Sequence, residues 1–193
     1  MDAVEKRLGD IAEIMTGTTG FSDNGRCCYR VIQPNSFDDT GALGVVETQT
    51  REEEIAAQQQ LRLGDILVKR LNPSFVYIVV PESAGMVASQ NLLIVRPGPS
   101  VDSLYLGFWL EQKEVMGQVE HVIGSSAAIK AVSTKKLAEV TVPIVSIEDQ
   151  RRIGAVWQLS RRRKQLLRDY LAENDRMVSI LASKILNMGG NRT

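Results

Sequence analysis

The chain has few of the residues from which most metal and redox sites are built. Its 193 residues include two cysteines and one histidine. Cys27 and Cys28 are adjacent, a spacing that suits neither an ordinary disulfide nor a pair of metal ligands, so we expect two buried small side chains in a reducing compartment. The single histidine, His121, excludes a histidine-rich metal site and any relay that needs a second histidine. We expect this histidine to be structural and the chain to hold no metal.

Motifs that mark common enzyme and cofactor sites are also missing. The sequence has no G-x-x-x-x-G-K-[ST], no G-x-G-x-x-G, no C-x-x-C and no H-E-x-x-H. Ser125 or Ser126 could meet His121 in space and form a small hydrolase site, although no acidic residue is indicated to orient the histidine. The sequence therefore offers little chemistry, and the hydrolase is kept as one alternative.

No apolar run approaches the roughly 18 residues of a membrane-spanning helix, and the N-terminal M-D-A-V-E-K-R-L-G-D lacks the apolar core of a signal peptide. We therefore expect a cytoplasmic protein. Lys plus Arg and Asp plus Glu number 23 each, but residues 1–145 carry 13 basic and 18 acidic side chains, whereas residues 146–193 carry ten basic and five acidic ones. The acidic balance of the first part counts against a nucleic-acid binder unless its basic residues converge on one face.

The stretch from Ser146 to Met188 contains no proline, and only Gly154 weakens its helix propensity. Ser146 can cap the first turn, Asp149 can complete a capping box, and the glycine pair that follows Met188 can end the helix. We predict one helix over residues 146–188, about 60 Å long at about 1.5 Å per residue, and a disordered tail over 189–193. The core of a domain of this size cannot cover so long a helix from end to end.

The apolar residues of this helix follow a heptad repeat with two seam positions. Such a seam requires a partner helix, and we expect the contact to involve Ile153, Trp157, Leu167, Leu171, Asn174, Val178, Leu181 and Ile185. Ser160, Lys164 and Asn174 interrupt the seam with polar groups, which can fix the register or orientation of the pairing. The alternative is a helix that folds back on its own domain and turns its polar positions to water.

Residues 1–145 contain short apolar runs of strand length between polar turns. We predict strands over residues 26–33, 43–49, 66–69, 75–80, 91–95 and 140–144, and helices over about 102–116 and 133–138. Residues 8–20 begin with a helical or turn segment and end in small, flexible residues. The continuously apolar runs at 75–80 and 91–95 indicate a sheet that is covered on both faces. The predicted fold is a compact α/β (α+β) domain over 1–145, followed by one long C-terminal coiled-coil helix.

Polar side chains lie at or near the ends of several predicted strands. The amides are Gln33, Asn35, Gln49, Asn72, Gln90 and Asn91, and the basic residues are Lys69, Arg70, Arg96 and Lys130. Long amides can read adenine edges in a major groove, and basic side chains can contact phosphates or guanines. The alternative is that these residues belong to ordinary solvated loops.

Several stretches, taken in order, resemble the specificity subunit of type I restriction-modification systems. L-G-D-I-A-E-I-M-T-G-T-T is similar to the start of a target recognition domain of that family, R-L-G-D-I-L-V to its middle element, and A-S-Q-N-L-L-I-V-R-P to the strand that follows. Y-L-G-F-W-L, G-S-S-A-A-I-K-A-V-S-T-K-K-L and V-P-I-V-S-I-E-D-Q-R-R-I are similar to the family's passage into its long spacer helix. The V-P-I-V-S-I segment has a single proline where the family often has two or more. Family members typically carry two recognition domains and two spacer helices, so this chain resembles a half-subunit.

The resemblance implies a chain that is not itself catalytic and takes no cofactor. A methyltransferase subunit would supply S-adenosylmethionine chemistry on adenine, and an endonuclease subunit would supply Mg- and ATP-dependent cleavage. The spacer helix would pair antiparallel with its counterpart, so a half-subunit would form a homodimer that reads an interrupted palindrome in double-stranded DNA. The DNA contacts that we expect on this basis are Gln33, Asn35, Lys69, Arg70, Gln90, Asn91, Ser125, Ser126 and Lys130. The competing hypothesis is a protein-interaction adaptor that dimerises through its helix without binding DNA.

Overall fold

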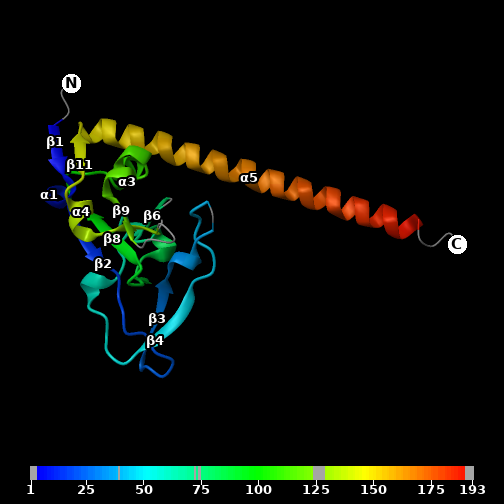
Figure 1. The fold of residues 1–193 in the computed structure, drawn as a ribbon, viewed down its shortest axis with the longest axis horizontal. Coiled ribbons are helices and arrows are strands. Elements are labelled where there is room, and N and C mark those ends of the chain that lie inside the picture. Colours follow the sequence, from blue (N-terminus) through cyan, green and yellow to red (C-terminus); the bar gives the residue numbers. More distant parts are fainter. Residues whose placement is uncertain (1–3, 39, 72, 74, 124–128, 190–193) are drawn as a thin grey trace. The chain divides into compact units, whose positions relative to one another are not determined.

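The computed structural model describes residues 4–38, 40–71, 73, 75–123 and 129–189. The chain forms two compact units, Met1–Ala155 and Val156–Thr193, whose boundary lies within one long helix, α5 (Ile147–Gly189). The predicted fold class, an α/β domain followed by a long C-terminal helix, is confirmed (Figure 1). The predicted disordered tail falls mostly on residues 190–193, which lie outside the described residues, and residue 189 belongs to the helix.

Two larger sheets belong to the first unit. The four-stranded sheet is antiparallel and has the order β2 (Ala12–Thr16), β8 (Leu92–Pro97), β5 (Ile66–Lys69) and β6 (Val76–Ile78). The three-stranded sheet has β3 (Cys27–Ile32) between antiparallel β4 (Glu47–Arg51) and parallel β7 (Val87–Ala88).

The main hydrophobic core contains residues from both sheets and from the segments that connect them. It consists of Ile32, Phe37, Leu61, Leu67, Phe75, Val79, Met86, Ala88, Leu92 and Ile94. The side chains of β5 from 66 to 68 and of β8 from 92 to 95 are all buried, which is the outcome expected for continuous apolar runs covered on both faces. Phe37 packs edge-on against Phe75, with ring centroids 5.5 Å apart.

Shorter elements complete this unit. Two strand pairs are antiparallel: β1 (Val4–Arg7) with β11 (Thr141–Ile144), and β9 (Glu120–Ile123) with β10 (Ile129–Val132). The helices are α1 (Leu8–Ile11), α2 (Ser103–Leu110), α3 (Lys113–Val119) and α4 (Thr134–Ala138), and the 3-10 turns are η1 (Pro34–Ser36), η2 (Ala57–Gln59) and η3 (Pro81–Ser83). In Figure 1, β1, α1, α4 and β11 gather at one end of the unit, and β3 and β4 lie at the other.

Four local predictions differ from the structure. Cys27 and Cys28, which were expected to be buried, are half-buried and exposed, because only the last two residues of β3 are buried. Residues 12–16, within the segment expected to begin as a helix or turn and end in flexible residues, form strand β2, because they pair with β8 along the whole strand. The strand expected at 43–49 lies at 47–51, because Leu43 and Val46 pack against the core from a loop while the more polar E-T-Q-T-R pairs with β3. The helix expected at 102–116 is two helices: α2 ends at Leu110, where the Gln112 side-chain amide donates to the Phe108 carbonyl at 2.9 Å, and α3 begins at Lys113.

The first turns of α5 belong to the first unit, which extends to Ala155 rather than to the predicted boundary at 145. The Ser146 hydroxyl accepts from the Asp149 amide at 3.1 Å and caps the helix as expected, and it also bonds the Asp149 carboxylate at 2.7 Å. Gln150 is 1% exposed and bonds three backbone groups, among them the Asp102 amide at 2.9 Å. Gly154 is required here, because a Cβ at this position would lie 2.6 Å from the Leu104 Cβ.

None of the helices in the described part of the chain combines the length and the apolar character needed to cross a membrane.

Candidate nucleic-acid interface

The ends of three strands meet at one edge of the first unit. Because β5 and β8 are antiparallel, the end of β5 lies opposite the start of β8, and Arg70 donates its backbone N–H to the Asn91 carbonyl at 3.0 Å. Because β3 and β7 are parallel, both end at this edge, and the Ser89 amide donates to the Ile32 carbonyl at 2.9 Å. The topology therefore brings residues 32–33, 69–70 and 89–91 together, although they are distant in sequence.

This edge carries most of the residues that the sequence singled out. We call it the strand-end surface and define it as Gln33, Asn35, Lys69, Arg70, Gln90 and Asn91. Lys130 lies on β10, whose last residue, Val132, donates its amide to the Arg70 carbonyl at 2.8 Å. Ser125, Ser126 and Asn72 lie outside the described residues. Their expected roles stay predictions.

Several side chains of the strand-end surface have defined positions. The Arg70 guanidinium donates to the Gln90 carbonyl at 3.3 Å, and the Lys69 ammonium lies 4.5 Å from the centroid of the Phe75 ring. The Gln33 amide donates to the Glu47 carboxylate at 3.4 Å. Asn35, Gln90 and Asn91 are exposed. Two cations held beside exposed amides suit contacts to phosphate and to base edges.

Arg96, one of the basic residues near strand ends, is bound inside the protein and is not part of this surface. Its side chain is 11% exposed and makes four hydrogen bonds inside the protein: two to the Asp65 carboxylate at 2.8 and 2.9 Å, and one each to the Gln58 and Gln60 carbonyls. The hydrogen bonds that Arg96 donates to the Asp65 carboxylate raise the pKa of Arg96 above its ordinary value. With most of its five N–H donors used in this way, Arg96 is a structural cation.

The segment T-G-T at the end of β2, which the sequence suggested to be flexible, underlies the strand-end surface. Gly17 donates its amide to the Leu92 carbonyl at 3.0 Å, and a Cβ at this position would lie 2.1 Å from the Ser89 carbonyl oxygen. The Thr18 amide donates to the Ala88 carbonyl at 2.7 Å, and the Thr18 carbonyl accepts from Gln90 at 3.0 Å. A glycine between two threonines was the only sequence signal for this close approach of backbones.

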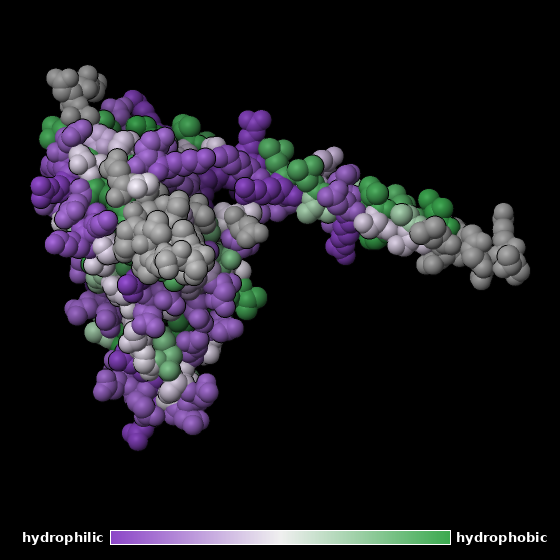
Figure 2. Space-filling model, viewed as in Figure 1, coloured by the Kyte–Doolittle hydropathy of each residue, from purple (hydrophilic) through white to green (hydrophobic). Residues whose placement is uncertain are grey.

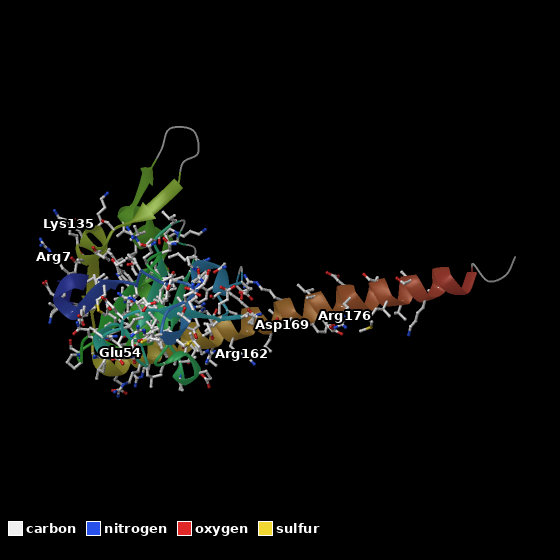
Figure 3. The ribbon with its side chains drawn as sticks, turned by 90° about the horizontal axis from the view of Figure 1, so that it is seen from below. Arg7, Glu54, Lys135, Arg162, Asp169 and Arg176 are labelled. Atoms are coloured by element: carbon white, nitrogen blue, oxygen red, sulfur yellow. The ribbon has the colours of Figure 1, made fainter. Side chains whose placement is uncertain are left out.

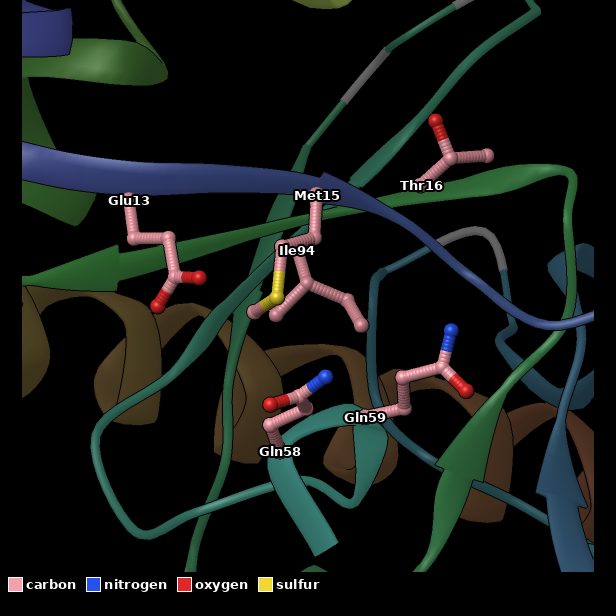
Figure 4. A pocket seen from close by; sticks show the side chains of 6 residues that line it. All are labelled: Glu13, Met15, Thr16, Gln58, Gln59 and Ile94. Carbon is pink, nitrogen blue, oxygen red and sulfur yellow. The ribbon is translucent and has the colours of Figure 1, made fainter. Parts of the chain in front are cut away.

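A hollow of about 430 Å³ opens on the four-stranded sheet close to the end of β2 (Figure 4). Its lining residues are Glu13, Met15, Thr16, Gln58, Gln59 and Ile94. Gln49, which the sequence placed at a strand end, instead lies within β4 and lines a second, polar hollow of about 280 Å³ with Phe21 and Asp23. Sequence reasoning found neither hollow, because each combines residues from segments far apart in the chain.

The part of α5 in the second unit exposes a broad apolar face, and Figure 2 shows apolar residues gathered along one side of it. Among the predicted seam residues, Leu167 and Leu171 are 54% and 60% exposed, and Val178, Leu181 and Ile185 are exposed as well. A second apolar row runs beside the seam and consists of Val156, Leu159, Leu166, Tyr170, Met177 and Ile180. Two seam residues differ: Ile153 is half-buried in the first unit, and Trp157 is half-buried with the Arg161 guanidinium 4.9 Å from its ring centroid.

Charged residues cover other positions of the same helix. Figure 3 labels Arg162, Asp169 and Arg176, which follow one another at intervals of seven residues. Gln165 donates to the Asp169 carboxylate at 2.8 Å, and Arg176 pairs with Glu173 at 3.7 Å. The alternation of an apolar face and a charged face is typical of a helix that pairs with other helices in water.

No family model matches the sequence, and no curated protein matches it either. Solved structures do share its fold. An HsdS subunit from Thermoanaerobacter tengcongensis matches with a TM-score of 0.66 and 19% identity over 92% of this chain and 47% of its own. A chain from a structure concerned with complex assembly and conformational transition of the type I R-M system matches with a TM-score of 0.66 and 20% identity over 95% of this chain and 44% of its own.

The S subunit of a type I restriction-modification system from M. genitalium matches with a TM-score of 0.61 and 13% identity, over 97% of this chain and 46% of its own. The chain thus spans less than half the length of each of these three structures, while almost all of its own length is matched. One domain with mixed sheets and one long helix is therefore the fold of one half of a type I restriction-modification S subunit.

Proposed function

We propose that this chain is a DNA-specificity half-subunit of a type I restriction-modification system, which reads one half of a bipartite DNA target and carries out no catalysis itself. The observation that carries the proposal is the fold, which nearly the whole chain shares with an HsdS subunit and with a type I restriction-modification S subunit. Two copies of the chain would then supply the two halves. Such a protein would act in the cytoplasm, where the chromosome is.

The strand-end surface would contact the DNA, together with Ser125, Ser126 and Lys130. Its support is the convergence of Lys69 and Arg70 with exposed amides in a unit that is otherwise acidic overall. Convergence on one face is the condition under which an acidic domain can still bind a polyanion. Lys69 and Arg70 would position the DNA through its phosphates, and the amides of Gln90 and Asn91 would read base edges.

The long helix would form the homodimer through its seam, and the second apolar row would dock the partner subunits. A single partner helix covers only the seam of a helix, so Leu159, Leu166 and Ile180 would stay available after dimerisation. We infer that methyltransferase and endonuclease subunits bind there. S-adenosylmethionine, ATP and Mg would be bound by those subunits and not by this chain.

If Lys69 contacts a phosphate, Lys69→Ala should weaken binding to all DNA sequences alike and reduce the slope of log affinity against log salt by about one unit. Lys6 provides a matched control. It lies on β1, which leads through α1 into the start of β2, whereas the strand-end surface lies near the end of β2. Lys6→Ala should therefore leave the slope unchanged. The measurement is fluorescence anisotropy with labelled duplexes between 50 and 200 mM salt (roughly the range over which such effects are large). An unchanged slope in Lys69→Ala would remove Lys69 from the interface.

The proposed function is tested by mapping adenine methylation in DNA from cells that express this chain with a type I methyltransferase subunit from the same source. Methylation of an interrupted palindrome is the expected result. An asymmetric bipartite site would contradict the homodimer and indicate pairing with a different specificity chain. No methylation, given a methyltransferase subunit that is active with another specificity chain, would favour the adaptor that does not bind DNA, a function consistent with the acidic balance of residues 1–145.

A further inference from the structure

The polar residues within the seam of α5 limit how two copies can pair. Along the seam, Ser160, Lys164 and Asn174 interrupt the apolar residues, and all three polar side chains are exposed. When two helices pair, each of these side chains faces a specific residue of the second copy. A lysine or asparagine that faces leucine loses its contact with water and gains no hydrogen bond. The favoured pairing is therefore the one in which the polar positions face each other.

Parallel pairing places like charges together. In a parallel pair each seam residue faces the same residue of the second copy, so the two Lys164 side chains would face each other in the middle of the contact. At the edge of the same contact, Arg163 would approach Arg168 of the second copy. No acidic residue lies between 150 and 168, so nothing in that segment would neutralise these cations. The sequence of the helix thus favours antiparallel pairing on electrostatic grounds alone.

In antiparallel pairing the two seam positions face each other, and the possible registers differ by whole heptads. In one register Lys164 faces Asn174, Leu167 faces Leu171, and the only mismatch is Ser160 with Val178. In the neighbouring register, seven residues further along, Lys164 faces Leu181 and Asn174 faces Leu171, so both polar groups lie against leucine. Only the first register lets the lysine ammonium donate to the asparagine carbonyl oxygen of the second copy.

We propose a specific register for the antiparallel pair that the resemblance implies: Lys164 of each copy lies opposite Asn174 of the other, and the two-fold axis crosses the contact at the level of residue 169. The inference rests on the homodimer of the proposed function and specifies its geometry. Each copy contributes the same two polar partners, so the contact contains two Lys164–Asn174 pairs on either side of a central Leu167–Leu171 cluster. Like charges approach each other at one place, where Arg168 comes near Arg168 of the second copy. This contact lies at an exposed edge, where solvent and salt screen the repulsion.

This register determines how far apart the first units of the two copies begin along the helix pair. Ala155 is the last residue of the first unit, and in this register it lies beside residue 183 of the second copy. The two Ala155 residues are then separated by 28 residues of helix, about 42 Å at about 1.5 Å per residue, or about 12 base pairs of DNA. The neighbouring register would give about 52 Å, or about 15 base pairs. The polar pair would therefore contribute to setting the spacing of the DNA target.

The test exchanges charges across the contact in the full chain and measures the dimer dissociation constant by sedimentation equilibrium. Asn174→Lys brings two lysines together twice per dimer and should weaken the dimer by about 30-fold or more. Adding Lys164→Glu to that variant creates two Glu–Lys pairs and should return the dissociation constant to within about threefold of the original. Ser183→Lys, outside the seam, is a control for added charge and should change little.

The outcomes separate this inference from the proposed function. A monomeric starting protein would contradict the homodimer itself. A double variant that dimerises no more tightly than Asn174→Lys would contradict the register while leaving the homodimer in place, because in the neighbouring register residues 164 and 174 both face leucine and the second substitution creates no ion pair. Circular dichroism of each variant checks that α5 is formed, so that loss of the helix is not mistaken for loss of pairing.

Discussion

Leu171→Lys is expected to convert the dimer into monomers at micromolar concentrations. Leu171 is 60% exposed in the single chain and lies at the centre of the seam, so in the proposed dimer two copies of it are buried. Burial of a leucine side chain contributes about 1.5–3 kcal/mol, and two are lost at once. A lysine in its place must also keep its ammonium in water. We expect the dimer dissociation constant to rise by about 1,000-fold or more, which sedimentation equilibrium can measure.

Ser179→Lys is the matched control for this substitution. Ser179 lies on the same helix but outside the seam, and its hydroxyl only donates to the Asp175 carbonyl at 2.9 Å. The control should therefore remain dimeric.

Loss of the dimer in Leu171→Lys should also lower the affinity for a bipartite duplex by about 100-fold or more, because each chain would then bind its half-site alone. A Leu171→Lys protein with the mass of a dimer would contradict the proposed interface.

Asp65→Ala is expected to lower the free energy of unfolding by about 3–5 kcal/mol, the range found when one partner of a buried ion pair is removed. Asp65 is 1% exposed, and its carboxylate accepts from Arg96 and from the Arg62 amide at 2.8 Å. The substitution leaves the Arg96 guanidinium buried without its counter-ion. Since small domains are stable by only about 5–15 kcal/mol, this is a large part of the total. Urea unfolding followed by circular dichroism measures the change.

Glu13→Gln tests whether this effect depends on burial. The Glu13 carboxylate also lies near Arg96, at 3.9 Å, but its side chain is 61% exposed. Ion pairs in contact with water contribute little, so we expect a change within about 0.5 kcal/mol. If both substitutions destabilised the protein equally, net charge near Arg96 would explain the result, and the buried pair would not be the cause.

The elements predicted well from the sequence are those whose signal is local. The strand at 66–69 was located to the residue, and the runs at 75–80 and 91–95 contain β6 and most of β8. The predicted helix at 146–188 and the observed helix at 147–189 agree to within one residue at each end. The agreement is close because the signals that end this helix, a serine cap and a terminal glycine, are local. In each case the stretch itself carries the cause of its structure.

The elements that were missed depend on a distant partner. The side chains of β1 are all exposed, so the strand has no apolar pattern of its own and exists because β11 pairs with it. β2 similarly depends on β8. Gly154, which reduces helix propensity, is required because α2 approaches α5 closely at this position. No periodicity within one segment can reveal an approach of two backbones.

The candidate interface was likewise predicted from the sequence only in part. Residue type was sufficient to select amides and cations near strand ends, and the topology brings Gln33, Arg70 and Gln90 to one edge. Residue type could not distinguish Arg70 from Arg96, two arginines next to strands. Arg96 points to the buried Asp65, whereas Arg70 reaches only the Gln90 carbonyl. The neighbours of a cation decide whether it is available to DNA.

The sequence by itself determined the two-part architecture, the length of the final helix and the seam along it, because helix caps and heptad spacing act over a few residues. Only the tertiary structure decided that the first unit includes the start of that helix, that β2 is a strand, and that three strand ends form one surface. These features arise from pairing between segments tens of residues apart. Hydrogen bonds and close contacts across such distances depend on the whole fold and leave little trace in any one stretch of sequence.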